Sequence, residues 1–200
     1  MNRFKTIAAP ALCALSGLFA FGTAAAAEPI DVAGVRYEAA ADVAGSQLVL
    51  NGAGLRKIVF FKVYAAGLYL PQPAASLAEA AAQDGPRRVR LTLLRNVSGS
   101  DFIEALDDGL KANLTPEGEA AIQKELTQLK AIMTEIGDVK EGDVVDFDFS
   151  PEAGTTVTRN GAPVGEAIPG KPLYDAVLAI WLGEKPIDGS LKKGLLGQKY

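Results

Sequence analysis

Few side chains in this 200-residue sequence could carry chemistry, because histidine is absent and cysteine occurs once. Without histidine the chain lacks the commonest metal ligand and the usual general base, which excludes Ser-His-Asp, Cys-His and His-Glu-x-x-His chemistry. We therefore expect neither a metal nor another cofactor. The remaining candidates are two neighbouring carboxylates, Asp146 and Asp148, and an arginine, Arg56, that closely follows a Gly-Ala-Gly run.

The two carboxylates resemble the paired acids of an acid–base enzyme, but their spacing favours another interpretation. Asp146 and Asp148 alternate with Val145, Phe147 and Phe149, and such alternation is typical of a half-buried strand. The apolar side chains would face the core, and the two acids would lie on the solvated face. Catalysis by this pair is therefore not expected.

Composition places the chain among ordinary globular proteins. Hydrophobic residues make up 48% and charged residues 22%, and the formal net charge is −4. This mixture excludes disorder and fibrous repeats and suits one domain with a sizeable core. The negative charge gives no electrostatic footprint for nucleic acid, so no nucleic-acid partner is expected.

The N-terminus has the pattern of a secretory signal peptide. Arg3 and Lys5 precede a mostly apolar run over residues 7–21, and four alanines follow at 24–27. A cationic start, a short apolar run and a small-residue exit are the three parts of a cleaved signal. The sequence thus predicts a signal peptide over residues 1–27, a single exported domain over 28–200, and the bacterial periplasm as its destination.

Two other interpretations of the N-terminus are less well supported. A membrane anchor needs roughly 20 uninterrupted apolar residues, whereas Pro10 breaks the run and the polar pair Glu28-Pro29 follows it, so no stable membrane anchor is expected. Cys13 follows Leu12 inside the apolar run, which is not the position of a lipid-modified cysteine. Removal of residues 1–27 leaves no cysteine, so stability must come from the core rather than from disulfides.

Periodicity along the rest of the chain predicts an α+β domain. Strands are expected at residues 32–37, 46–50, 58–70, 88–94 and 144–149, and in a hairpin at 155–159 and 164–168 around Asn160-Gly161. Helices are expected at 77–82, from a cap at Ser98 or Ser100, from Pro116 to Gly137, at 173–182, and as a short segment at 191–196. This order predicts an antiparallel sheet with helices on one face.

Three stretches together resemble the chalcone isomerase-like family. They are LNGAGLR at residues 50–56 with FFKVYAAGLYL at 60–70, LRNVSG at 94–99, and DAVLAIWLG at 175–183 with Leu191-Lys192. They occur in the family's order and span residues 46–197. The predicted export signal places the chain in the secreted bacterial branch of that family.

The resemblance implies an open-faced β-sandwich, in which helices pack on a large curved antiparallel sheet and a ligand cleft lies between them. Plant members cyclise chalcones by intramolecular Michael addition, whereas related members bind fatty acids or assist partner enzymes. Three functions therefore stay open. They are non-catalytic binding of a hydrophobic carboxylate such as a fatty acid, which we favour, an isomerase or intramolecular lyase activity, and a partner-binding module without a small ligand.

The resemblance also implies five ligand-binding positions. The arginine that holds the substrate in plant enzymes is retained as Arg56, and a threonine that polarises the substrate ketone corresponds to Tyr64. A tyrosine, an asparagine and a second threonine correspond to Phe102, Gly109 and Ile180. The last three positions have lost their polar function, so the implied cleft is more apolar and suits an alkyl chain.

Each of these residues also has a purely structural interpretation. Arg56 could pair with a surface carboxylate, and Tyr64, Phe102 and Trp181 could simply pack in the core. Eight residues of straight strand span roughly 26 Å, so Arg56 and Tyr64 can bind one ligand only if the chain reverses between them. Residues 58–62 are poor turn sequence, and without a reversal Arg56 would act alone or not at all.

Overall fold

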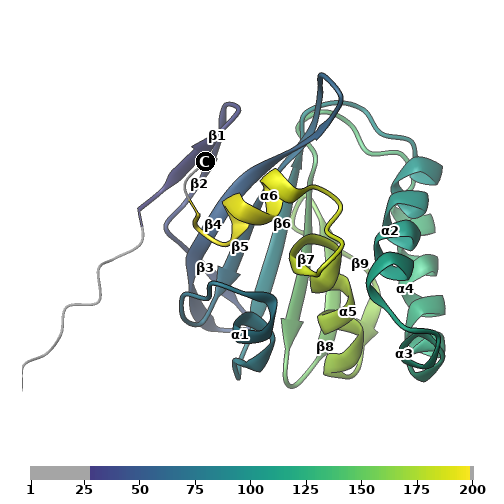
Figure 1. The fold of residues 1–200 in the computed structure, drawn as a ribbon. Helices are drawn as coiled ribbons and strands as arrows, with labels where there is room; N and C mark the ends of the chain where they lie inside the picture. The colour runs from purple at the N-terminus through teal and green to yellow at the C-terminus, as the bar shows by residue number, and fades with distance from the viewer. Residues whose placement is uncertain (1–27, 199–200) are drawn as a thin grey trace, which may run out of the picture.

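A curled antiparallel sheet forms the centre of the molecule (Figure 1). The computed structural model describes residues 28–198, so the predicted signal peptide at residues 1–27 lies outside the described residues. The sheet contains β3 (Ala40–Val43), β4 (Ser46–Ile58), β5 (Phe61–Leu70), β6 (Arg87–Leu93), β7 (Val144–Ser150), β8 (Gly154–Arg159) and β9 (Ala162–Ile168). The seven strands lie side by side in chain order, and every neighbouring pair is antiparallel.

The helices gather on one face of this sheet (Figure 1). They are α1 (Leu77–Ala82), α2 (Gly99–Asn113), α3 (Pro116–Ala121), α4 (Gln123–Ile136), α5 (Lys171–Leu182) and α6 (Gly189–Leu195). Helix α5 lies against the sheet, α2 packs on α5, and α4 covers β9. The predicted α+β architecture, with helices on one face of a curved antiparallel sheet, is confirmed.

Local sequence explains where the first long helices begin. The Ser98 hydroxyl accepts a hydrogen bond from the Asp101 amide at the start of α2, and Thr115 caps α3 in the same way. One continuous helix had been expected from Pro116 to Gly137. The structure instead breaks it at Ile122, whose φ of −121° separates α3 from α4.

The strand predictions missed two chain reversals. Residues 32–37 form two short strands, β1 (Ile30–Val32) and β2 (Val35–Tyr37), joined at Ala33-Gly34. Residues 58–70 were expected to form one strand, but the chain turns at Val59-Phe60, so that β4 and β5 form a long hairpin. The turn was missed because neither residue is a usual turn former.

The main core lies between the sheet and the helices. Helix α5 is buried along most of its length, from Leu173 to Leu182. The helix-facing side of the sheet supplies alternate apolar residues, for example Val89 and Leu91 of β6 and Phe147 of β7. This period-2 pattern makes the helix-facing side of the sheet mostly apolar, with Arg87 paired to Asp175 of α5 as a buried exception.

A bulge in β4 connects the sheet to the last helix. Asn51 is the extra residue between the register pairs of Leu50 and Gly52. Its amide donates hydrogen bonds to the carbonyls of Ala74 and Leu195, at 3.0 and 2.7 Å. A side chain at Gly52 would lie only 2.2 Å from the Gly194 carbonyl, so α6 can approach only because this position is glycine.

The other face of the sheet carries a smaller core, beneath the β1–β2 hairpin. Tyr37 of β2 packs so closely on β5 that a Cβ at Gly67 would lie 2.4 Å from its ring. The Tyr37 hydroxyl lies 3.4 Å from Thr92 Oγ1 on β6. Burial raises the pKa of Tyr37 well above its ordinary value.

The expectation that Asp146 and Asp148 lie on a solvated face is wrong. Both are buried, and each forms a bidentate ion pair with an arginine across the β6–β7 ladder. Asp146 accepts from Arg90 at 2.8 and 2.8 Å, and Asp148 accepts from Arg88 at 2.7 and 2.6 Å. The alternation was interpreted correctly, but periodicity cannot show that arginines of the neighbouring strand pair with the acids of the polar face. The two acids are structural ion-pair partners.

We expect Asp146→Ala to destabilise the fold, because it leaves Arg90 without its partner in a partly buried position. Removing one member of a buried pair costs about 3–5 kcal/mol. Since the Arg90 side chain is 34% exposed and can regain some water, we expect about 2–4 kcal/mol, measured by urea unfolding. The control is Asp31→Ala, which removes an exposed partner of Arg36 and should change stability by less than about 0.5 kcal/mol. Equal effects of the two substitutions would contradict the assignment.

Candidate ligand-binding pocket

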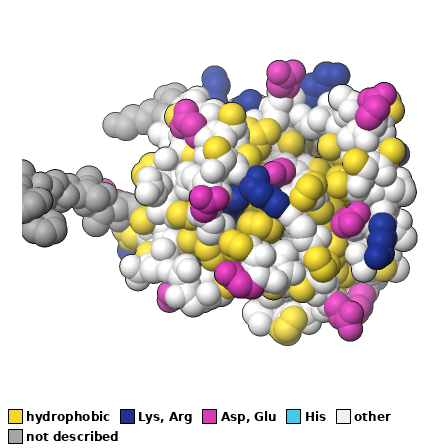
Figure 2. Space-filling model, turned by 90° about the horizontal axis from the view of Figure 1, so that it is seen from below, with side chains coloured by type: hydrophobic (Ala, Val, Ile, Leu, Met, Phe, Trp, Pro, Cys, Tyr) yellow, Lys and Arg dark blue, Asp and Glu magenta, His cyan; other side chains and the backbone are white. Residues whose placement is uncertain are grey.

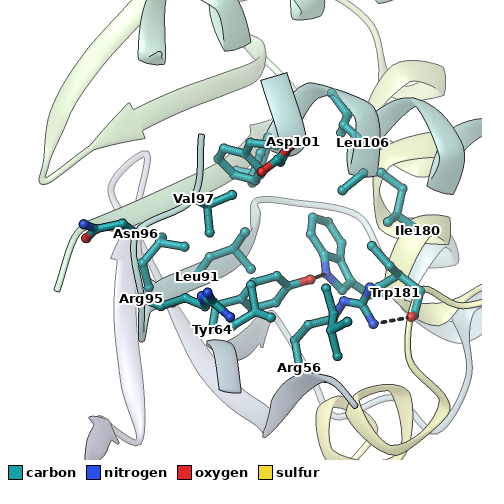
Figure 3. A pocket seen from close by; sticks show the side chains of 17 residues that line it. Arg56, Tyr64, Leu91, Arg95, Asn96, Val97, Asp101, Leu106, Ile180 and Trp181 are labelled. Atoms are coloured by element: carbon teal, nitrogen blue, oxygen red, sulfur yellow. Dashed lines mark hydrogen bonds between the residues drawn. The ribbon is translucent and has the colours of Figure 1, made fainter. Parts of the chain in front are cut away.

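An apolar pocket of about 330 Å³ lies between the sheet and helices α2 and α5 (Figure 3). Its walls come from β4, β5, β6 and β7, from the segment before α2, and from α2, α5 and the loop before α6. The volume is at the lower end of the range of small-molecule sites. The polar groups of the lining are Arg56, Tyr64, Arg95, Asn96, Asp101 and the Trp181 indole.

The β4–β5 hairpin brings Arg56 and Tyr64 together. The turn at Val59-Phe60 reverses the chain, and Arg56 and Tyr64 become directly paired residues of the two strands. A bulge follows, because Lys57 pairs with Lys62 and leaves Val63 as the extra residue. Both Val63 and Tyr64 consequently line the pocket. The reversal required for a shared site is present.

Tyr64 links the sheet to helix α5. Its hydroxyl accepts a hydrogen bond from Trp181 Nε1 at 3.0 Å. Burial raises the pKa of Tyr64 to about 12, although the Trp181 hydrogen bond and the charge of Arg56 act in the opposite direction. The phenol therefore stays protonated at neutral pH. Since its oxygen is already an acceptor, its own proton is available for a ligand oxygen.

Arg56 lies at the pocket wall, with its side chain 17% exposed. One guanidinium nitrogen, Nη1, donates to the Ile187 carbonyl at 2.7 Å and lies 3.8 Å from Asp188 Oδ2. These contacts fix the guanidinium beside the loop that precedes α6 (Figure 3). The pairing with Asp188 is too long for a hydrogen bond, so the positive charge is only partly compensated.

The pocket has a second guanidinium that the sequence did not reveal as a site residue. Arg95 follows β6 and lies with its Cζ 4.9 Å from the centre of the Phe61 ring. Asn96 and Asp101 also line the pocket. Arg95-Asn96 belong to one of the resembling stretches. A basic residue directly after a buried strand was the available signal.

The remaining walls are apolar, and two of the predicted residues belong to them. Phe102 of α2 is half-buried, whereas Ile180 of α5 is buried, and both line the pocket. Leu91, Leu106 and Phe147 complete this surface. In Figure 3, Arg95, Tyr64 and Arg56 lie along one side of the pocket, with Leu106 and Ile180 on the other.

Gly109 is the predicted residue that does not reach this pocket. It lies where α2 crosses α5, and a Cβ there would be 2.6 Å from Ile180 Cγ2. It borders a neighbouring, more polar depression, which shares Arg56 with the main pocket and includes Lys185. Gly109 thus sets the distance between the two helices, and through Ile180 it shapes one wall.

The described part of the chain has neither a metal-type cluster of side chains nor a helix of membrane-spanning character. Residues 28–198 contain no cluster of three or more His, Cys, Asp or Glu side chains suited to a metal ion. No helix within the same range is both long and apolar enough to span a membrane.

The fold and the pocket define a class: an antiparallel sheet covered by helices, with an apolar cleft between the two layers. A family model described as chalcone isomerase-like matches residues 29–197. The chain belongs to this chalcone isomerase-like family, as the three sequence stretches had indicated.

One solved structure supports the same fold. The crystal structure of a fatty-acid binding protein of Arabidopsis thaliana is similar to this chain, with a TM-score of 0.62 and 18% sequence identity. The match covers 84% of this chain and 96% of that one. At this identity the likeness establishes the fold alone. A comparison with curated proteins gave no match.

The raised pKa of Tyr64 gives a test of its burial. The folded state holds the phenol proton more tightly than the unfolded state. The contribution of the protonated Tyr64 to the unfolding free energy is therefore complete below pH 10 and is lost as the pH rises toward 12. Between pH 8 and pH 11 the wild type should lose about 1 kcal/mol more unfolding free energy than Tyr64→Phe. Urea titrations of both proteins at the two pH values measure this difference. An identical loss in both would show that Tyr64 ionises normally.

Proposed function

We propose that the protein binds a hydrophobic carboxylate, such as a fatty acid, in the pocket between the sheet and the helices, without catalysing a reaction. The observation that carries this proposal is the division of the pocket surface. Two guanidinium groups and a protonated phenol lie on one side, and most of the remaining lining is aliphatic and aromatic, apart from Asn96 and the Asp101 carboxylate at the start of α2. Such a surface matches a ligand with one anionic end and one apolar end.

The polar side suits a carboxylate for specific reasons. An arginine presents two parallel N–H donors that match the two oxygens of a carboxylate. Arg56 uses Nη1 for its contacts with Ile187 and Asp188, which leaves Nε and Nη2 for a ligand. The Tyr64 proton adds a neutral donor. A carboxylate bound there would also compensate a charge that Asp188, at 3.8 Å, neutralises incompletely.

The family membership agrees with this proposal, and the similar Arabidopsis structure is that of a fatty-acid binding protein. The pocket also argues against a module that binds only a partner protein. An exposed Arg56 with no apolar pocket beside it would favour that function, whereas Arg56 is largely buried and lines such a pocket.

An isomerase function has less support in this pocket. Cyclisation of a chalcone needs donors directed at the oxygen where the enolate charge develops. Phe102 and Ile180 offer no donor where the family's enzymes have hydroxyls, and Gly109 lies outside the pocket. Each missing donor of this kind is worth about 2.7–4 kcal/mol, or 10² to 10³ in rate.

Binding can be measured through Trp181, the single tryptophan of the chain, because its indole lines the pocket. We expect palmitate to change Trp181 fluorescence saturably. Arg56→Gln should weaken binding about tenfold, which corresponds to the loss of one charge-assisted hydrogen-bond pair, about 1.4 kcal/mol. Arg95→Gln should act in the same direction.

Two controls separate carboxylate recognition from nonspecific adsorption. Arg36→Gln removes an exposed guanidinium on β2, away from the pocket, and should leave affinity unchanged. The methyl ester of palmitate should bind more weakly than palmitate and should not respond to Arg56→Gln. If palmitate does not bind at all, or if the ester and the acid bind equally well, the proposal is wrong.

We expect no cyclisation of naringenin chalcone above the uncatalysed rate. The reason is the loss of hydrogen-bond donors at Phe102, Gly109 and Ile180. A spectrophotometric assay with chiral analysis of the flavanone tests this directly. Any trace of activity should disappear in Arg56→Ala, whereas robust stereoselective turnover would make the isomerase the correct function.

A further inference from the structure

The largest exposed hydrophobic side chains within residues 28–198 are four consecutive residues at one place. Ile58, Val59, Phe60 and Phe61 are 51%, 77%, 91% and 61% exposed, and they form the tip of the β4–β5 hairpin. In Figure 1 this tip projects beyond the rest of the sheet. Large apolar side chains gathered on a surface indicate a site of contact with another apolar surface.

The turn itself departs from the chemistry used elsewhere in the chain. Val59 has φ of +55°, which is unfavourable for a β-branched residue. The other two-residue hairpin turns of the described chain contain glycine, at Ala33-Gly34, Ala44-Gly45 and Asn160-Gly161. An Asn-Gly turn would be favoured here as well. Apolar residues thus occupy the Val59-Phe60 turn, although Asn and Gly would adopt a two-residue turn with less backbone strain.

Positive charges surround the base of this tip. Lys57 and Lys62 are exposed and face each other across the hairpin, and the Arg95 guanidinium lies over the Phe61 ring. None of the three takes part in an ion pair among residues 28–198. One acid beside the hairpin, Asp188, accepts from the Lys57 amide and contacts Arg56.

The charges around the tip are opposite in sign to the net charge of the chain. The chain as a whole is acidic, with a formal net charge of −4. The face opposite the hairpin tip has acidic side chains spread among hydrophobic and polar ones, with basic groups near its centre (Figure 2). The cations around the tip therefore stand out against an acidic protein.

We propose that the β4–β5 hairpin tip inserts into the interfacial region of a lipid bilayer that contains anionic lipids. Apolar and aromatic side chains partition into the headgroup–acyl boundary, and the surrounding lysines and arginines are attracted to anionic headgroups. A protein partner fits less well. Four side chains on a narrow tip cannot supply the roughly 800 Å² that each partner contributes to a standard interface, whereas a bilayer needs no complementary shape.

The position of the tip also connects this surface to the pocket. Ile58 is part of the tip and of the pocket lining, and Arg56 and Arg95 line the pocket directly below it. If the tip enters a bilayer, this end of the pocket lies close to the headgroups. An amphiphile could then pass between the membrane and the pocket along the hairpin. This transfer, unlike the insertion itself, rests on the proposed function.

Flotation with vesicles tests the insertion. The protein is residues 28–200, which contain every described element of the fold. We expect it to float with vesicles of phosphatidylcholine and phosphatidylglycerol, and to float less with phosphatidylcholine alone or at high salt. Val59→Asn with Phe60→Gly should weaken vesicle binding at least about tenfold. This variant installs the turn sequence of residues 160–161, so it should fold at least as well.

The charges are tested by Lys57→Gln with Lys62→Gln, which should abolish the preference for anionic vesicles. Arg36→Gln, on the hairpin of the other sheet face, is the matched control and should float like the wild type. Absence of wild-type flotation, or equal flotation of the turn variant, would overturn the proposal. So would self-association in analytical ultracentrifugation that depends on Phe60 while vesicles are not bound, since the tip would then join two copies.

Palmitate binding in solution, followed by Trp181 fluorescence, is measured on the same variants. Neither Val59 nor Phe60 lines the pocket, so the turn variant should keep its palmitate affinity. Loss of vesicle binding with palmitate binding intact supports the insertion. Vesicle binding without any palmitate affinity would support the insertion and refute only the proposed ligand.

Discussion

The pairing register of β4 and β5 is the constraint on which the pocket depends. It places Arg56 directly opposite Tyr64. Side chains alternate between the faces of a strand, so a slip of one residue would turn both away from the helices. The bulge at Val63 then lets two consecutive residues reach the pocket. Tyr64 in turn receives the Trp181 hydrogen bond that ties α5 to the sheet, so the position of the helical layer follows from the same register.

The two faces of the sheet differ in where their charged residues lie. The helix-facing side is mostly apolar, with the buried Arg87 paired to Asp175 of α5, whereas the other side carries Arg88, Arg90, Asp146 and Asp148. These four groups neutralise one another, which leaves them little capacity for acid–base chemistry. The cations available to a ligand are instead those at strand ends and loops. Arg56 lies beside the hairpin turn, and Arg95 follows β6.

Much of the fold followed from the sequence, because periodicity and capping are local. The helix beginning at Ser98 and the Asn160-Gly161 hairpin were predicted on those grounds. Events that depend on distant segments were not predictable. The turn at Val59-Phe60 lacks turn residues, and the ion pair that holds the buried Asp146 joins it to Arg90, 56 residues earlier in the chain. For the site, the resemblance supplied Arg56, but Arg95 entered only through its place beside the pocket.

The unfavourable sequence of the Val59-Phe60 turn is informative about function, because the stability of the fold does not require it. A Val-Phe turn with a positive φ and a nearly fully exposed phenylalanine is less favourable than the Asn160-Gly161 turn of the same sheet. Nothing in the core requires it, since neither Val59 nor Phe60 packs against the described core. Such local conflicts concentrate at functional positions. The paired strands of the hairpin thus hold the pocket residues in register, and its turn presents an apolar surface that adjoins the pocket at Ile58.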